Sequence, residues 1–201
     1  MVDKFIDEIM ELNDLPGIAI GVSIGTEENG GFTEQTAARG YVDISLKGTD
    51  GEQLLTDDSI FHCASVSKLI TSTCIMKLVE KGKLNIYDRL SDVLPEFSMD
   101  DERFREVRLW NMMTHTSGLG DVDDYHWERP ETEDDSLENY VYNSDEVKKI
   151  PMLWDPQISP AFYGSDENLF RYSNIAYEIL GQIDAEKSGM SYEDFAKAEV
   201  F

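Results

Sequence analysis

Hydrophobic and polar positions follow two different periods along the chain, and each period predicts a type of element. In residues 2–12, apolar side chains recur at helical spacing opposite acidic ones, which predicts an amphipathic helix. Residues 18–24 and 32–44 are predicted strands, and the Gly-rich segment 27–31 between them is typical of a turn. The first sixty residues therefore predict one helix followed by an antiparallel hairpin.

Helical patterns dominate the rest of the chain. Residues 65–82 are apolar round much of the circumference, which predicts a buried helix, and Gly82 marks its C-terminal end. Shorter helical segments are predicted within residues 88–97 and 107–114, and a long helix begins at Asn174. The combined pattern predicts a mixed α+β fold in which helices flank an antiparallel sheet.

One segment departs from both periods. Residues 121–146 hold eleven carboxylates against one arginine and show no periodicity typical of a core element. We interpret an acidic insertion, about residues 120–165, as a solvated segment that crosses the surface. The alternative is a lid over a functional site that sets substrate preference.

Composition excludes several classes of partner. The chain has 201 residues, 41% of them hydrophobic, which is ordinary for a globular domain, and a formal net charge of −24. Such an acidic chain repels nucleic acid and anionic membranes, so we expect neither as a partner. Acidic residues stand in segment 1–13, where a secretory signal would be basic and then apolar, so we expect a cytoplasmic location.

Cysteines and histidines give no sign of a disulfide or a metal site. Cys63 and Cys74 are expected to be free, buried thiols. The three histidines, His62, His115 and His126, lack metal-ligand spacing, so no metal or cofactor is expected. We interpret His115 as a structural residue that forms hydrogen bonds within a turn.

Candidate chemistry begins at the start of the predicted helix 65–82. Ser65 and Lys68 are three residues apart, so they share a helix face and the lysine amine lies near the serine hydroxyl. A serine hydroxyl is a poor nucleophile at neutral pH and needs a base within hydrogen-bond reach. A buried lysine amine can supply that base, and the helix N-terminus favours a developing alkoxide.

A second motif, Tyr172-Ser173-Asn174, stands about one hundred residues later, at the start of another helical pattern. A tyrosine hydroxyl can relay a proton, and an asparagine amide can donate to a substrate carbonyl. Ser-x-x-Lys alone is a frequent string in which the serine merely caps a helix. Together, however, the two motifs predict a serine acyl-transfer site.

At this point the chain resembles a known family, the serine β-lactamase and penicillin-binding-protein superfamily. Within it, the resemblance is to the branch of class C β-lactamases, D-alanyl-D-alanine carboxypeptidases and esterases. Four blocks in the same order carry the resemblance, which runs over nearly the whole chain: FHCASVSK at 61–68, LVEKGKL with Asp88 and LPEF at 78–97, LWNMMTHTSGL at 109–119, and FRYSNIAYEIL at 170–180.

The resemblance implies a β-lactamase/transpeptidase-like fold and a role for each motif residue. Ser65 is implied to be the acylated nucleophile, with its backbone N–H as half of the oxyanion hole. Lys68 is implied as its partner base, Tyr172 as the second proton-transfer group, and Asn174 as a ligand to substrate and to Lys68. Either Lys68 or Tyr172 could take the first proton. The implied substrates are a β-lactam, a D-amino-acid peptide or a small ester.

Members of this family also carry a Lys-Thr-Gly or His-Thr-Gly triplet on a later sheet strand, and no such triplet follows Asn174 here. We therefore expect residues 1–201 to form the N-terminal portion of one catalytic domain, incomplete at the C-terminus. Residues 1–60 would supply a helix and the first strands, and residues 61–201 a helical region. A C-terminal fragment or a second chain could complete the sheet, because two strands alone are marginal.

Two competing interpretations remain. Ser23 lies in a Gly-x-Ser-x-Gly string, but it falls inside the first predicted strand rather than at a strand-to-helix elbow. The absent triplet motivates the second alternative, a non-catalytic scaffold or ligand-binding protein that keeps the fold. Between the hydrolases, we favour an esterase or peptidase-like enzyme over a dedicated resistance enzyme, because no export signal is seen.

Overall fold

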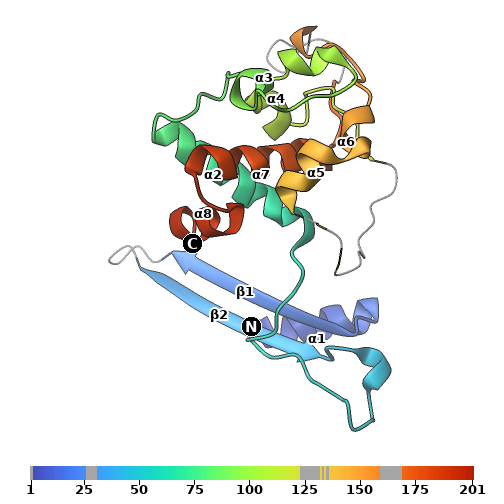
Figure 1. The fold of residues 1–201 in the computed structure, drawn as a ribbon. Helices are drawn as coiled ribbons and strands as arrows, with labels where there is room; N and C mark the ends of the chain where they lie inside the picture. Colours follow the sequence, from blue (N-terminus) through green and yellow to red (C-terminus); the bar gives the residue numbers. More distant parts are fainter. Residues whose placement is uncertain (1, 26–30, 123–131, 133, 135, 159–168) are drawn as a thin grey trace. The chain divides into compact units, whose positions relative to one another are not determined.

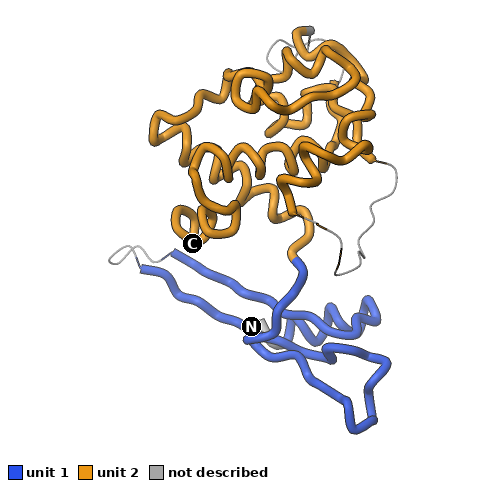
Figure 2. Tube along the Cα trace, in the orientation of Figure 1, with its two compact units in different colours: residues 1–62 blue, residues 63–201 orange. Residues whose placement is uncertain are grey.

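The computed structural model describes residues 2–25, 31–122, 132, 134, 136–158 and 169–201. The chain divides into two compact units, Met1–His62 and Cys63–Phe201, which Figure 2 draws in different colours. Both candidate motifs fall in the second unit.

The first unit consists of one helix and one hairpin (Figure 1). Helix α1 spans Val2–Asn13, and strands β1 (Gly17–Gly25) and β2 (Phe32–Gly40) pair antiparallel, with Gly21 opposite Thr36. The predicted helix and hairpin are therefore confirmed. The second strand ends earlier than predicted, because Ile44–Leu46 form a 3-10 turn that is capped by the Asp43 carboxylate.

Few side chains of this first unit are buried. Helix α1 packs on the hairpin, and Ile6 and Ala37 are the buried apolar residues that the structure describes there. Ile24 and Phe32, at the end of the hairpin where β1 finishes and β2 begins, are 61% and 72% exposed. A two-stranded sheet with one packed helix offers little apolar area to bury, so this unit has only a minimal core.

The second unit is helical (Figure 1). Its longest helices, α2 (Ser67–Glu80) and α7 (Asn174–Ser188), pack against each other, and α8 (Tyr192–Glu199) contacts both. Four shorter helices complete the set: α3 Leu90–Val93, α4 Leu109–Met113, α5 Leu137–Asn143 and α6 Asp145–Lys149. The mixed fold class is as predicted, with an antiparallel sheet in one unit and helices in both.

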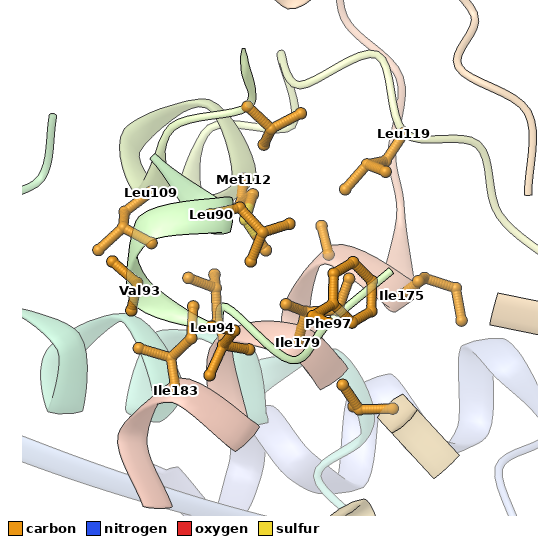
Figure 3. Close-up of a cluster of buried hydrophobic side chains, with 14 of the residues drawn as sticks. Leu90, Val93, Leu94, Phe97, Leu109, Met112, Leu119, Ile175, Ile179 and Ile183 are labelled. Carbon is orange, nitrogen blue, oxygen red and sulfur yellow. The ribbon is translucent and has the colours of Figure 1, made fainter. Parts of the chain in front are cut away.

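A continuous hydrophobic core lies inside this second unit. Side chains from α3, α4, α7 and the intervening segments meet there, as Figure 3 shows for Leu90, Val93, Leu94, Phe97, Leu109, Met112, Leu119, Ile175, Ile179 and Ile183. All ten are buried, and Phe97 stacks edge-on against Phe104 at a centroid distance of 5.5 Å. Burial on this scale fixes the positions of α2 and α7, the helices that begin at the two motifs.

The ends of α7 follow the sequence closely. Ser173 caps its N-terminus, because the Ser173 hydroxyl accepts a hydrogen bond from the Ala176 N–H at 3.2 Å. Gly189 ends it in the left-handed conformation with φ of +78°, which glycine adopts without steric cost. The start that was predicted at Asn174 is therefore confirmed.

Helix α2 differs from the prediction in its burial. Cys74, Ile75 and Leu78 are buried, but Leu69 is 67% exposed, so the helix packs on one side only. The predicted burial of this helix is therefore confirmed for one face only, because Leu69 and Met76 on the helix remain exposed. Cys63 is likewise exposed rather than buried. Both thiols are free, as expected.

The described part of the acidic segment also corrects the sequence interpretation. Helices α5 and α6 lie within it, capped by the Ser136 and Ser144 hydroxyls, and they bury Val141 and Val147 in the core. Two apolar residues six apart on two short helices give no periodic signal, so sequence patterning missed them. Residues 123–131, which hold four of the eleven carboxylates, fall outside the described residues.

The described residues contain neither a membrane-spanning helix nor a cluster of metal ligands. No helix there is long and apolar enough to cross a bilayer. Nor do three or more histidine, cysteine, aspartate or glutamate side chains of that part of the chain gather in a way that could hold a metal ion.

Candidate active site

Ser65 lies in the 3-10 turn Ala64–Val66, which leads directly into α2. The sequence predicted it in the first helical turn, so its position is one short turn earlier. The preceding residue, Ala64, has φ of +45°, a left-handed conformation that alanine rarely adopts. Strained backbone of this kind persists where the surrounding structure imposes it and is frequent at functional sites. The turn leaves the Ser65 side chain exposed.

Lys68 lies one turn further along and points back at the serine. Its Nζ atom is 3.4 Å from the Ser65 Oγ and donates a hydrogen bond of 2.6 Å to the Asn174 Oδ1. The lysine side chain is half-buried. The three-residue spacing therefore brings amine and hydroxyl together, as the sequence predicted.

Tyr172 reaches the serine from the segment before α7. Its hydroxyl donates to the Ser65 Oγ at 2.6 Å, the shorter of the two contacts that Ser65 makes with the candidate bases. The Lys68 Nζ stands 4.8 Å from the centroid of the Tyr172 ring, within cation–π range. The Tyr172 phenol and the Lys68 amine thus approach the same oxygen atom, one from the N-terminal end of α7 and the other from that of α2.

The environment of Tyr172 favours loss of its proton. Partial burial of the phenol raises its pKa, but the neighbouring Lys68 and the Ser65 hydroxyl stabilise the phenolate more strongly. The net effect lowers the pKa of Tyr172 below the ordinary value of 10.0. A lowered pKa increases the fraction of the phenol that is ionised at neutral pH, and only the ionised form can accept a proton from the serine.

Asn174 begins α7 and faces two charged groups. Its side-chain oxygen accepts from Lys68, and its Nδ2 donates to the Asp121 Oδ2 at 3.1 Å. Asp121 also accepts from two backbone N–H groups at the start of α7, those of Asn174 at 3.1 Å and Ile175 at 3.4 Å. Amine, amide and carboxylate therefore form a continuous chain of hydrogen bonds.

His115 packs beside the site as a structural residue. Its ring centroid is 4.4 Å from that of Tyr172 and 5.2 Å from that of Tyr177, and its Nδ1 accepts from the Ser173 N–H at 3.2 Å. Burial, followed by the charge of Lys68, lowers the pKa of His115. The neutral ring can keep accepting the Ser173 hydrogen bond, which fits the structural role that the sequence suggested.

The turn that follows His115 is fixed by a glycine. Gly118 has φ of +79°, and a Cβ atom there would lie 2.8 Å from the Trp154 carbonyl oxygen. Both the left-handed backbone and the close approach require glycine. Residues 115–121 are thereby held as one structured segment that delivers the His115 ring and the Asp121 carboxylate to the start of α7.

The structure brings together all four residues that the sequence singled out: Ser65, Lys68, Tyr172 and Asn174. Sequence reasoning missed Asp121, because it opens a strongly acidic stretch and its carboxylate resembled one more solvated charge. The available signal was its position, two residues after Leu119, where the block LWNMMTHTSGL ends. Ser23 lies within β1, as expected for a strand residue.

This arrangement can carry out nucleophilic chemistry. A hydroxyl within reach of a phenol of lowered pKa and of an amine has both a route for its proton and a nearby positive charge. An amide that is anchored on one side can still donate its second hydrogen, because an asparagine NH2 group carries two.

The chain is similar in sequence to penicillin-binding proteins and β-lactamases. The chain is 30% identical over 148 residues to penicillin-binding protein 4 of Amycolatopsis lactamdurans, covering 73% of this chain and 35% of that protein. It is 24% identical over 200 residues to a β-lactamase of Pseudomonas fluorescens, covering 100% of this chain and 47% of that protein. The chain thus spans less than half the length of these relatives.

Solved structures share the fold over nearly the whole chain. The octameric penicillin-binding protein homologue from Pyrococcus abyssi superposes with a TM-score of 0.66 at 23% identity, covering 98% of this chain and 41% of that one. EstCE1, described as a hydrolase with promiscuous acyltransferase activity, gives a TM-score of 0.70 at 20% identity, covering 99% and 49%. Because the Beta-lactamase family model matches residues 2–201, the chain belongs to the Beta-lactamase family.

Proposed function

We propose that the chain carries the nucleophile of a serine hydrolase that forms an acyl-enzyme on Ser65. One observation carries the proposal: the Tyr172 hydroxyl and the Lys68 amine both lie within hydrogen-bond distance of the Ser65 Oγ, at 2.6 Å and 3.4 Å. A nucleophile and its candidate bases in contact form the minimal unit of covalent acyl transfer.

In the proposed reaction, the Ser65 Oγ attacks the carbonyl carbon of the substrate while its proton passes to ionised Tyr172. The Lys68 ammonium stabilises the phenolate before this transfer. The tetrahedral oxyanion that forms takes a hydrogen bond from the Ser65 backbone N–H. When it collapses, the bond to the leaving group breaks and Tyr172 returns the proton to that group.

The second half of the reaction releases the acyl group. A water molecule or an amine attacks the ester carbonyl of acylated Ser65 and gives its proton to Tyr172. The Ser65 oxygen then leaves and recovers a proton from the phenol, so the enzyme is regenerated. In both halves, Asn174 is proposed to hold the substrate with the side-chain hydrogen that Asp121 does not take.

Three substrate classes fit this chemistry: a β-lactam, a D-amino-acid peptide and a small ester. Relatives and structural neighbours support the range, because they include penicillin-binding proteins, β-lactamases and a hydrolase with acyltransferase activity. All three classes present a carbonyl to a serine nucleophile and differ in the shape of the pocket.

A labelling assay tests the proposal. The chain is treated with a fluorescent penicillin and, separately, with a fluorophosphonate, and fluorescence on the protein is compared with that of Ser65→Ala. We expect a covalent label on the original chain and none on Ser65→Ala. Equal labelling of both proteins, or of neither, would reject the enzyme and favour a ligand-binding protein that keeps the fold.

Substrate class is then assigned by turnover. Hydrolysis of a chromogenic cephalosporin, a D-alanyl-D-alanine peptide and a p-nitrophenyl ester is measured with the same preparation, with Ser65→Ala as the background. The class that is hydrolysed fastest above this background identifies the substrate type.

A further inference from the structure

Asp121 makes more contacts with the start of α7 than a helix cap needs. Ser173 already caps this helix through its hydroxyl, and that hydroxyl also donates to the Gly120 carbonyl oxygen at 2.8 Å. Asp121 adds hydrogen bonds from the backbone N–H groups of Asn174 and Ile175. Asp121 also accepts a hydrogen bond from the Asn174 side chain. That bond satisfies no backbone group of α7, so it does not contribute to capping the helix.

The chemistry of the two side chains gives this hydrogen bond a role. An ionised carboxylate only accepts hydrogen bonds, so the group of Asn174 that faces Asp121 must be its NH2. The amide oxygen then points the other way, toward the Lys68 Nζ at 2.6 Å. A reversed amide would set an NH2 group against the lysine ammonium, two donors face to face. Asp121 thus selects one of the two orientations of the amide.

The consequence extends to the nucleophile. The amide oxygen of Asn174 is the closest acceptor of the Lys68 amine, and the same amine lies 3.4 Å from the Ser65 Oγ. A lysine side chain has several rotatable bonds, so one strong acceptor decides where its amine rests. When that acceptor turns away, the amine is free to leave the serine and the phenol.

We propose that Asp121 is a positioning residue of the Ser65 site, which orients the Asn174 amide and, through it, holds the Lys68 amine against the nucleophile. This inference rests on the proposed acyl transfer for its effect on rate. Asp121 accepts hydrogen bonds from Asn174 and Ile175, so its proposed effect on Ser65 passes through Asn174 and Lys68.

Three variants of the full 201-residue chain test this proposal. Asp121→Ala removes the acceptor, and Asp121→Asn keeps an oxygen that can accept from the Asn174 NH2 group. Asp101→Asn is the matched control: Asp101 is another half-buried carboxylate of the same unit, which accepts from backbone N–H groups of Arg103 and Met152. Asp101 has no hydrogen bond to the four motif residues in the described structure.

The first readout is the rate at which a fluorophosphonate acylates Ser65, measured over a range of probe concentrations. We expect Asp121→Ala to lower the maximal rate constant about 30- to 100-fold, because misplacement of a catalytic group by about 1 Å costs on that order. The half-saturating concentration should change little, Asp121→Asn should recover part of the rate, and Asp101→Asn should match the original chain. If Asp121 only stabilised the fold, Asp121→Ala would react at the original maximal rate under conditions in which circular dichroism shows the variant to be fully folded.

A second readout does not need activity. Nuclear magnetic resonance follows hydrogen exchange of the Asn174 side-chain NH2 group, which should become at least ten-fold faster in Asp121→Ala and stay unchanged in Asp101→Asn.

The acylation rate and the exchange rate together distinguish failure of the proposed acyl transfer from failure of the positioning role of Asp121. If the original chain reacts and Asp121→Ala reacts at the same maximal rate, the positioning role is wrong while the function stands. If the original chain does not react, the function fails, and the exchange measurement alone decides on Asp121. Unchanged exchange in Asp121→Ala would overturn the positioning role in either case.

Discussion

The two units of the chain differ in how many apolar side chains they bury. Residues 63–201 gather their apolar side chains into one continuous core, whereas residues 1–62 bury Ile6 and Ala37 and leave Ile24 and Phe32 largely in solvent. The difference follows from the elements, because several helices can enclose a core and a single hairpin with one helix cannot. Precise side-chain geometry is therefore expected in the helical unit.

The candidate site lies in the unit that has the continuous core. Ser65, Lys68, Tyr172, Asn174 and Asp121 all belong to the helical unit, and they are placed by α2 and α7, whose inner faces line its core. Packed helices hold side chains in fixed rotamers more firmly than exposed strands do. The expectation that further strands pair with the hairpin, from a C-terminal fragment or a second chain, stays a prediction.

The largest expected effect concerns an acid inside the packed unit. Asp184 on α7 is fully buried, and neither of its carboxylate oxygens has a hydrogen-bond partner among the described residues, so burial raises its pKa to about 8. The folded chain favours the neutral form of the Asp184 carboxyl. The contribution of this group to the free energy of unfolding is therefore fully present below its pKa in the unfolded chain, and it is lost as pH rises through about 8. Asp184→Asn should therefore be more stable than the original chain at pH 8, by as much as about 5 kcal/mol, and should gain little at pH 4.

Urea unfolding followed by circular dichroism at the two pH values measures this difference. Asp43 in the hairpin unit is the contrasting acid, because hydrogen bonds from Ser45 lower its pKa. Asp43→Asn should lose stability at neutral pH rather than gain it. A gain for Asp43→Asn, or none for Asp184→Asn at pH 8, would contradict the contrast between a packed and an exposed unit.

Loss of the phenol should follow as the next largest effect. Tyr172→Phe keeps the ring against His115 and removes the hydroxyl that contacts Ser65, so acylation should slow about 10³-fold, or ~4 kcal/mol. Stability should be nearly unchanged, because Tyr172 is exposed. The rate of fluorophosphonate labelling measures the effect, and Tyr142→Phe, which alters a phenol bonded to Glu186, serves as the control. Equal rates for the two variants would exclude Tyr172 as a proton-transfer group.

Truncation of a core side chain should cost somewhat less. Ile179 on α7 is fully buried, so Ile179→Ala should lower the free energy of unfolding by about 3 kcal/mol through lost burial and a residual cavity. Because α7 starts at the site, labelling of Ser65 should also slow near the midpoint of unfolding. Urea denaturation gives the free energy, and a loss below about 1 kcal/mol would show that the helical core is loosely packed.

The same truncation in the hairpin unit is expected to have the smallest effect. Ile24 is 61% exposed, so Ile24→Ala should change the free energy of unfolding by less than about 0.5 kcal/mol. The matched pair Ile24→Ala and Ile179→Ala uses the same chemical change in both units. A loss at Ile24 as large as that at Ile179 would mean that the hairpin is covered in solution.

Periodicity, capping residues and short spacings in the sequence predicted the features of the fold that depend on residues close together in the chain. The hairpin 17–40, the helix that starts at Asn174 and the contact between Ser65 and Lys68 all follow from period, capping and spacing within a short window. The meeting of Tyr172 with Ser65 could not be derived from spacing, since over one hundred residues separate them, and came from the resemblance to a family.

Other features depend on packing between distant segments and left no trace in the sequence pattern. Helices α5 and α6 bury only Val141 and Val147, and Leu69 on α2 is apolar yet exposed. Asp121 takes its place in the site because its carboxylate accepts hydrogen bonds from the start of α7. Such residues acquire their roles from tertiary contacts rather than from periodicity.

The most direct test is to find which atom carries the acyl or phosphonyl group. The chain is reacted with a fluorophosphonate, digested, and the modified peptide is sequenced by mass spectrometry. Convergence of Tyr172 and Lys68 on one oxygen predicts a single adduct on Ser65, with its neighbour Ser67 and the strand residue Ser23 unmodified. An adduct on Ser67 or Ser23 while Ser65 stays intact would contradict the account.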